Sequence, residues 1–355
     1  MLRLEPRPRS SPLIQALTPV LAILATMIAG GILFMALGKD PVEAIRLIFI
    51  APFGDAYSRT EILIKAAPLI LIALGLAFGF RAGIWNIGAE GQFIMGGIAG
   101  TAVALAFWNV EGVWLLPLMV LAGAAGGFAW AMIPAILKVR FNANEILVSL
   151  MLVYVAGHFL SAMVAGPMRD PQGFNFPQSR QFHDSARLPL LIAGSRVHVG
   201  VGVAFVAVAV AHLLLTRHLF GFNVRLLGEA PRAAVFSGVN TKRLTIVCLG
   251  LSGGLAGLAG IFEVAGPIGQ LQPSLPVGYG FTAIIVAFLG RLSPIGILFG
   301  GCVLALTYIG GETAQFRLGL PAAAISVFQG MLLFFLLAMD ILTRYQVVRL
   351  RPRGV

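Results

Sequence analysis

The sequence predicts an all-helical polytopic membrane protein with about ten transmembrane helices and both termini in the cytoplasm. Three observations support this fold class. The chain of 355 residues is 58% hydrophobic and only 11% charged, whereas about a quarter of the residues in soluble domains are charged. Its apolar residues gather in runs long enough to cross a bilayer. Its basic residues lie between those runs, where membrane topology explains them better than nucleic-acid binding does.

Ten apolar runs are candidate spans, because a transmembrane helix needs about 20 predominantly apolar residues. The first run follows the basic segment "MLRLEPRPRSSP". It exceeds the apolar core of a cleaved signal, about 7–15 residues, so we expect a retained helix. The shortest loop, at Arg291, separates the eighth and ninth runs. In chain order the runs are about 13–37, 62–80, 84–107, 113–137, 144–165, 197–216, 244–264, 277–291, 293–310 and 322–342.

The distribution of Lys and Arg predicts the orientation. With the N-terminus in the cytoplasm, sixteen of the 25 Lys and Arg residues fall on the cytoplasmic side and nine on the other. This excess agrees with the positive-inside rule. We expect residues 1–355 to form a single transmembrane domain. Its longest loops would be a cytoplasmic one at about 217–243 and an outer one at about 166–196.

Small residues recur four positions apart in several predicted helices. This spacing places two glycines on one helix face and lets the backbone of a neighbouring helix approach closely. It therefore predicts a tightly packed bundle but no particular function. The pairs are Gly96/Gly100, Gly123/Gly127, Gly253/Gly257 and Gly296/Gly300.

Motifs of catalysis are absent from the sequence. It has no G-x-x-x-x-G-K-[ST] loop for binding ATP and no G-x-S-x-G nucleophile elbow. Its five histidines lack metal-ligand spacing, and Cys248 and Cys302 lie inside apolar runs. We therefore expect no enzymatic activity, no metal and no cofactor in this chain.

The stretch "FRAGIWNIGAEGQF", residues 80–93, carries polar groups and glycines between two apolar runs. Asn86 and Glu90 are four residues apart, so a helix would place them on one face. An ionisable residue near a membrane span is a candidate functional residue. Two interpretations stay open for this stretch and for Gln92 within it. The side chains either cap and hold the hairpin, with Glu90 bonded to backbone amides, or they contact a translocation path.

Three further spans carry polar residues near their ends. Asn144 and Glu145 open the fifth span, where an acidic residue suits the helix dipole and capping is the favoured interpretation. Glu263 lies near the outer end of the seventh span, and Glu312 follows the ninth on the same side. Together with Phe281 they either line an outer vestibule or belong to interface and loop structure.

The stretch "RLLGEAPRAAVFSGVNTKRL", residues 225–244, lies in the longest predicted cytoplasmic loop. Ala230 and Pro231 are expected to open a short helix, because proline suits the first helical position. Gly238 is expected to end that helix. A helix outside the membrane and flanked by basic residues suits docking to a soluble partner and, equally, contact with lipid headgroups.

Four stretches together identify a family resemblance. They are residues 65–97, 141–157, 226–244 and 278–301. With them the sequence resembles the permease subunits of bacterial ATP-binding-cassette (ABC) importers in the branched-chain amino acid, ribose and nucleoside group. Within that group it is most similar to the larger nucleoside (basic membrane protein-type) permease.

The resemblance implies a permease of the bacterial inner membrane that takes up nucleosides or related purine-like solutes. Its partners would be a second permease, a cytoplasmic two-cassette ATPase that binds ATP and Mg, and an extracytoplasmic solute-binding lipoprotein. A coupling helix would contact the ATPase through Gly228, Glu229, Ala230, Pro231, Ala233, Ala234, Gly238 and Asn240. The candidate path or gate residues are Asn86, Glu90, Gln92, Asn144, Glu145, Glu263 and Phe281.

The sequence departs from the nucleoside pattern at Val153, where "MLVY" stands in place of "MLNY". Sugar or branched-chain amino acid import is therefore an alternative. A secondary transporter that uses Glu90 or Glu263 as a proton site is a second alternative. Such a carrier would not need the 225–243 loop.

Overall fold

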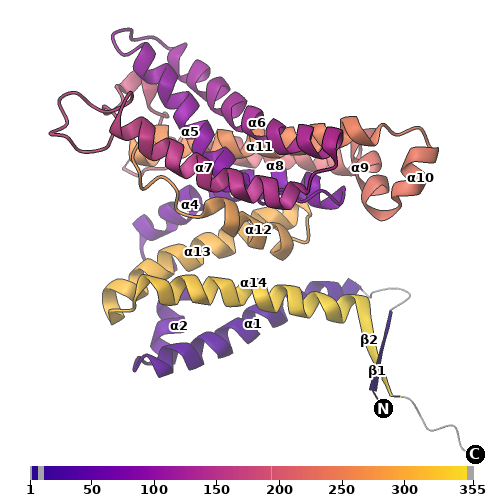
Figure 1. Cartoon of the computed structure of the whole chain (residues 1–355). Coiled ribbons are helices and arrows are strands. Elements are labelled where there is room, and N and C mark those ends of the chain that lie inside the picture. Colours follow the sequence, from indigo (N-terminus) through magenta and orange to yellow (C-terminus); the bar gives the residue numbers. More distant parts are fainter. Residues whose placement is uncertain (1, 7–11, 193, 350–355) are drawn as a thin grey trace, which may run out of the picture. The chain divides into compact units, whose positions relative to one another are not determined.

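The computed structural model describes residues 2–6, 12–192 and 194–349, so parts of the basic N-terminal segment lie outside the described residues. The described chain is almost entirely helical (Figure 1), which confirms the all-helical fold class. It divides into two compact units, which we describe separately. One comprises Met1–Ser58 and Leu306–Val355, and the other comprises Arg59–Ala305.

The elements follow the predicted runs closely. They are β1 (Leu2–Pro6), α1 (Pro12–Ala36), α2 (Pro41–Phe49), α3 (Ala51–Gly54), α4 (Ala56–Arg81), α5 (Ala89–Ala106), α6 (Leu115–Phe141), α7 (Glu145–Ala165), the 3-10 helix η1 (Asp184–Ala186), α8 (Val199–Thr216), α9 (Leu219–Glu229), α10 (Pro231–Phe236), α11 (Thr241–Glu263), the π-helix η2 (Val264–Ile268), α12 (Tyr279–Leu289), α13 (Pro294–Leu318), α14 (Ala322–Arg344) and β2 (Tyr345–Arg349).

Eight of the described helical segments are long and apolar enough to cross a membrane. The other two predicted spans correspond to α5 and α12, and each is shorter than expected. The third span was predicted from residue 84, but helix α5 begins at Ala89 after a non-helical stretch. Helix α12 has 11 residues, which extend only about 16 Å at 1.5 Å per residue. The ninth span is longer than predicted, so Glu312 lies within α13, where it is exposed.

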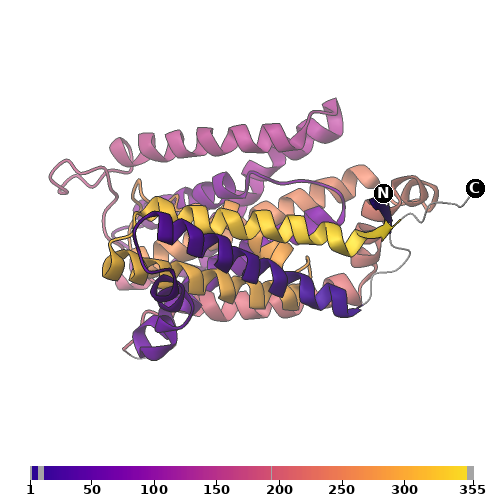
Figure 2. The same ribbon diagram turned by 90° about the horizontal axis from the view of Figure 1, so that it is seen from below.

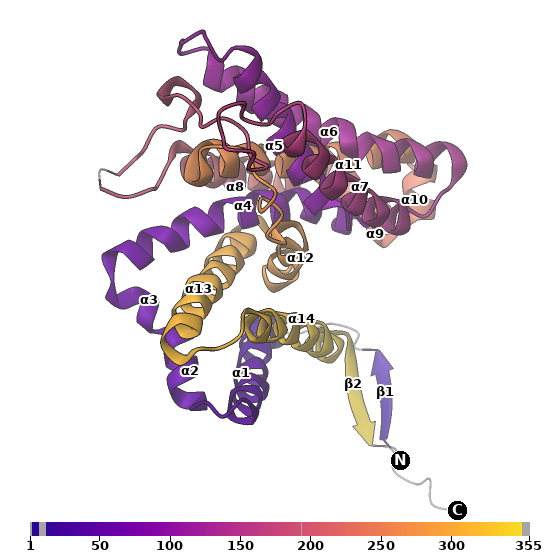
Figure 3. The same cartoon turned by 60° about the vertical axis from the view of Figure 1, so that its left-hand side comes forward.

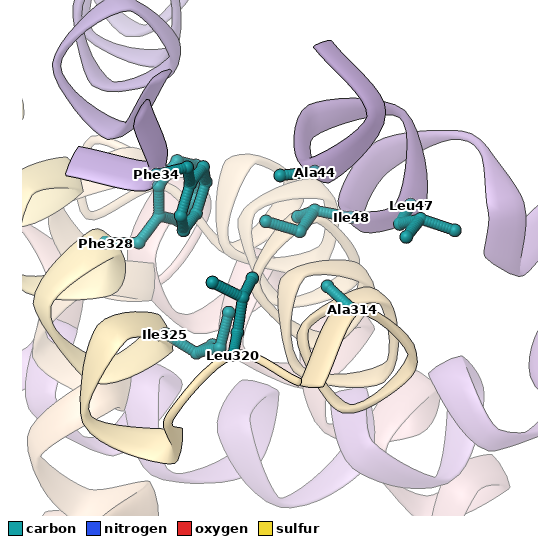
Figure 4. Packing of buried hydrophobic residues seen from close by; sticks show 8 residues of the cluster. All are labelled: Phe34, Ala44, Leu47, Ile48, Ala314, Leu320, Ile325 and Phe328. Atoms are coloured by element: carbon teal, nitrogen blue, oxygen red, sulfur yellow. The ribbon is translucent and has the colours of Figure 1, made fainter. Parts of the chain in front are cut away.

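The unit that contains both chain ends is held together by α1 and α14, which lie alongside each other (Figure 2). Phe34 of α1 stacks on Phe328 of α14 with ring centroids 5.9 Å apart. The strands β1 and β2 pair in antiparallel fashion (Figure 3), so residues 2–6 lie beside residues 345–349. The buried cluster of this unit (Figure 4) consists of Phe34, Ala44, Leu47, Ile48, Ala314, Leu320, Ile325 and Phe328.

The larger unit is built around α5, α6 and α11, which pack against one another through glycines. A Cβ atom on Gly257 of α11 would overlap the backbone of Gly123 and Gly127 on α6. One on Gly96 of α5 would overlap Gly257 itself. The backbones are therefore in direct contact, which confirms the close packing predicted from the glycine spacing.

Burial differs sharply among the helices of this unit. Helix α4 is buried along most of its length. Helix α7 instead exposes Leu147, Met151, Tyr154 and Val155, each at least half exposed. An apolar face open to the surroundings is what a helix in contact with lipid presents. The chain is a multi-pass membrane protein.

Candidate functional site

The stretch between α4 and α5 is not helical. Residues 84–88 have no helical structure, and α5 begins only at Ala89. The expectation that Asn86 and Glu90 stack on one helix face is therefore wrong. Glycines explain the difference, because Gly83 has a φ of +73° and ends the preceding helical turn.

The Glu90 carboxylate closes the N-terminus of α12. It accepts hydrogen bonds from the backbone N–H groups of Gly278 at 2.9 Å and Gly280 at 2.5 Å. Amides in the first turn of a helix have no intrahelical acceptor, and the helix dipole favours a negative charge there. Glu90 is 2% exposed. Of the two interpretations of Glu90, the structure shows the bonds to backbone amides. These amides belong to α12, which is far from Glu90 in the sequence, and not to the hairpin itself.

Gly280 permits this contact by having no side chain. A Cβ on Gly280 would overlap the backbone of Glu90. Gly278, at the N-cap, has a φ of +86°, which favours glycine. The sequence "GYG" at 278–280 therefore places two backbone donors at the start of α12 and leaves room for α5.

Asn86 and Gln92 form a buried side-chain network with Ser252 of α11. The Asn86 Nδ2 atom donates to Gln92 Oε1 at 2.8 Å and to Ser252 Oγ at 2.9 Å. Gln92 Nε2 donates back to Asn86 Oδ1 at 3.0 Å, and the Gly88 N–H donates to the same oxygen at 3.1 Å. The side-chain amides of Asn86 and Gln92 thus bond to each other, and the bond from Asn86 to Ser252 fixes residues 84–88 against α11.

Asn144 and Glu145 act where α6 turns into α7. The Asn144 side chain accepts from the backbone N–H groups of Ile146 and Leu147, so its predicted capping role is confirmed. Glu145 forms an ion pair with Lys138 at 2.5 Å. It also accepts a long bond from the Trp85 N–H at 3.5 Å. Glu145 therefore connects the α6–α7 turn to the 84–88 stretch.

Glu263 belongs to a cluster of charged residues that the sequence did not reveal. Arg196, before α8, donates to both oxygens of Glu61 on α4, at 2.9 Å from Nε and 2.6 Å from Nη2. Lys65 and Arg196 place positive charge near the Glu263 carboxylate, and the Tyr279 side chain lies close to it. Glu263 is 7% exposed, so an interface position with its carboxylate in water is excluded.

The charge cluster also involves the aromatic side chains at the start of α12. The Lys65 ammonium lies 5.5 Å from the Tyr279 ring centroid, and Phe93 packs edge-on against the same ring at 5.8 Å. Phe281, two residues after Tyr279, is 40% exposed. One feature of the sequence could have indicated this charge cluster. Glu61 and Lys65 lie four residues apart beside an apolar run, which is the spacing of an i,i+4 ion pair on a helix.

The loop at 217–243 folds as two short helices. Helix α10 begins at Pro231 and ends before Gly238, whose φ is +77°, as predicted. Asn240 caps α11 by accepting from the Arg243 N–H at 2.9 Å. Helix α10 buries only Ala234 and leaves Phe236 91% exposed. Phe236 was not among the expected coupling residues, because the sequence alone does not distinguish an exposed aromatic residue from one in the hydrophobic core.

Comparison with known proteins places the chain among transport proteins. Residues 58–337 match the family described as "Branched-chain amino acid transport system / permease component". A glucose ABC transporter permease protein of Haloferax volcanii is 38% identical over 98% of this chain and 93% of its own length. A guanosine ABC transporter permease protein of Bacillus subtilis is 29% identical over 95% of this chain and 97% of its own. A second guanosine permease protein of that organism is 29% identical over 72% and 83%, respectively. No solved structure matches.

Proposed function

The chain belongs to the permease family of branched-chain amino acid transport systems, and we propose that it forms the solute path of an ABC importer for nucleosides or related solutes. It is a membrane-embedded permease subunit of the branched-chain amino acid, ribose and nucleoside group. The observation that carries the coupling part of this proposal is α10. A short helix that exposes 91% of a phenylalanine outside the candidate spans suits insertion into a soluble partner.

The topology that fits this function has ten passes. Eight are the full-length spans, and two are half-helical, made by the 84–88 stretch with α5 and by the 269–278 stretch with α12. Pairing of β1 with β2 supports an even number of passes, because it brings the segment before α1 and the segment after α14 together. The excess of Lys and Arg favours the cytoplasm for that side. The two compact units then act as one permease domain.

The coupling segment comprises residues 228–240. Its exposed surface would contact a cytoplasmic two-cassette ATPase, which binds ATP and Mg and hydrolyses ATP for transport. Pro231 and Ala233 are exposed, whereas Ala234 anchors the helix to the permease. Gly238 and Asn240 end the segment and start α11. Phe236 joins the coupling residues predicted from the sequence.

The remaining partners follow from the same importer architecture. Two guanosine permease proteins of one organism resemble this chain, which supports a second permease subunit beside it. An extracytoplasmic binding lipoprotein would deliver solute to the outer side. In this arrangement the gate of the solute path is held in place by the hydrogen bonds of Asn86, Glu90 and Gln92. Glu145 connects these residues to the α6–α7 turn. Glu263 and Phe281 lie on the outer part of the path.

Sugar import is the second candidate function, because the glucose permease relative is 38% identical over nearly the whole chain. Glucose and nucleosides share an uncharged, hydroxyl-rich ring. Neutral solutes also suit a site where Glu90 already occupies the free amides of α12. An anionic group would lack those donors.

The test is purification of the tagged chain from its native membrane, followed by uptake of labelled guanosine and glucose with and without ATP. The Phe236→Asp variant should no longer co-purify with the ATPase and should no longer take up solute. Phe174→Asp is the matched control for ATPase binding, since Phe174 in the loop at 166–196 is 95% exposed and also lies outside the candidate spans. An ATPase retained in full by Phe236→Asp would refute the docking role of α10. Uptake that follows a proton gradient and ignores ATP would refute the importer.

A further inference from the structure

We propose that Arg81 is a positioning residue that transmits movement of the coupling segment to α12 and, through α12, to Glu90. This inference rests on the proposed function and adds the route by which the ATPase would act on the path. It depends on three successive contacts within the Arg59–Ala305 unit.

The first contact joins the coupling segment to the end of α4. Gly228 lies so close to Arg81 that a Cβ atom on it would overlap the Arg81 carbonyl oxygen. Gly83, just beyond, also faces Gly228, whose Cα would lie 3.8 Å from a Cβ on Gly83. Because backbone meets backbone here, no side-chain rotation can absorb a displacement. Movement of α9 and α10 therefore displaces Arg81.

The second contact joins Arg81 to the turn that follows α12. Its Nε atom donates to the Leu292 carbonyl at 2.9 Å. Arg291 and Leu292 have φ values of +52° and +55°, a left-handed conformation that is unfavourable for residues other than glycine. The Leu292 N–H is bonded to the Ala287 carbonyl at 2.7 Å. The Arg81 guanidinium thus holds a strained turn that is locked directly onto the last turn of α12.

The third contact is at the other end of α12, where Gly278 and Gly280 donate to Glu90. An 11-residue helix is rigid over its length of about 16 Å. A shift of the Leu292 turn must therefore move the donors of Glu90. Strained turns of this kind are found where a structure switches between two arrangements. The route from Gly228 to Glu90 contains only backbone contacts, one helix and two sets of side-chain hydrogen bonds.

The experiment uses the purified importer complex in proteoliposomes and measures ATP hydrolysis and solute uptake together. We expect Arg81→Gln to retain the ATPase subunit and hydrolyse ATP, but to lower the uptake per ATP about tenfold or more. Arg81→Lys, which keeps the charge and one donor, should recover part of that ratio. Arg217→Gln, an exposed arginine at the end of α8, is the control and should equal the wild type.

Leu292→Gly gives a second test that does not endanger folding. Glycine relaxes the left-handed conformation, so the protein should become more heat-stable while its uptake per ATP falls. A purely structural role of the turn predicts no such opposite changes. An unchanged ratio in Arg81→Gln or in Leu292→Gly would overturn the proposal, as would loss of the ATPase in Arg81→Gln. Failure of the wild type to bind an ATPase would instead refute the proposed function.

Discussion

Glu90 holds the backbone N–H of Gly280, a residue 190 positions later in the chain, at the start of a helix only 11 residues long. The bond joins the first turn of α5 to the first turn of α12. A carboxylate inside a membrane protein is costly unless it is paired or hydrogen-bonded. Here two backbone donors and a helix dipole stabilise it. Glu90 therefore determines how α12 sits on α5.

Replacing Glu90 with alanine should destabilise the protein and stop transport. The buried N–H of Gly280 and the partly buried N–H of Gly278 would lose their acceptor, and each unsatisfied buried donor costs about 1–3 kcal/mol. We expect a loss of about 3 kcal/mol in the free energy of unfolding. Glu90→Gln keeps one oxygen acceptor without the charge and should fall between alanine and wild type. Thermal unfolding in detergent and uptake in vesicles measure the two effects.

The control for this series is Glu111→Gln, which removes a carboxylate from an outer polar pocket formed with His183 and Arg187. Its stability and uptake should match those of the wild type. If Glu90→Ala unfolded at the wild-type temperature, the bonds to Gly278 and Gly280 would contribute nothing to stability. The structural role of Glu90 would then be wrong.

Adding a methyl group at Gly280 should separate α5 from α12. The Cβ would overlap the backbone of Glu90, so Gly280→Ala forces a backbone shift that costs about 1–3 kcal/mol. Gly157 of α7 has nothing within 4 Å of the same added atom. Gly157→Ala should therefore change stability little or raise it by up to about 1 kcal/mol. Equal melting temperatures for the two variants would contradict the close approach.

Much of the helical architecture was predictable, because apolar runs and helix caps depend on residues that are close together in the sequence. The Asn144 cap, the start of α10 at Pro231 and its end before Gly238 were all anticipated correctly. The late start of α5 was not. Hydropathy does not register that residues 84–88 are not helical, since an apolar residue scores the same in either conformation.

The candidate site was less predictable for a related reason. The polarity of Asn86, Glu90 and Gln92 identified the right stretch, but their partners lie on α11 and at the start of α12. Those partners are a serine and two backbone amides, which no motif marks. Arg196, assigned to an outer loop, proved to be the partner of Glu61. Contacts across such sequence distances depend on tertiary packing.

Removing Arg196 should leave the carboxylate of Glu61 buried without its two donors. The Glu61 side chain is 5% exposed but that of Arg196 is 51% exposed, so solvent screens the pair and we expect a loss of about 1–2 kcal/mol in Arg196→Ala. Adding Glu61→Gln to this variant should recover part of it. Arg46→Ala breaks an exposed pair with Glu43 and should change stability by less than about 0.5 kcal/mol. Chemical denaturation of the four proteins measures these differences, and equal losses in the two arginine variants would contradict the prediction.

Acidification should destabilise the protein through His198, which precedes α8. Its Nδ1 atom accepts from the Gly200 N–H at 3.1 Å, so the folded protein needs the neutral ring. Burial lowers the pKa of His198 to about 4 from its usual 6.5. The unfolded chain therefore binds more protons between those pH values. The contribution of His198 to stability is complete above pH 6.5 and falls by about 1.4 kcal/mol per unit of pH down to about pH 4.

His198→Asn isolates this effect, because asparagine can accept the same N–H but does not titrate in this range. The stability of the wild type, measured by denaturation from pH 7 to pH 4, should fall relative to the variant by about 3 kcal/mol in total. The difference should open only below about pH 6.5. Curves that stay parallel over the whole range would mean that the pKa of His198 is the same in the folded and the unfolded protein, which would contradict the prediction.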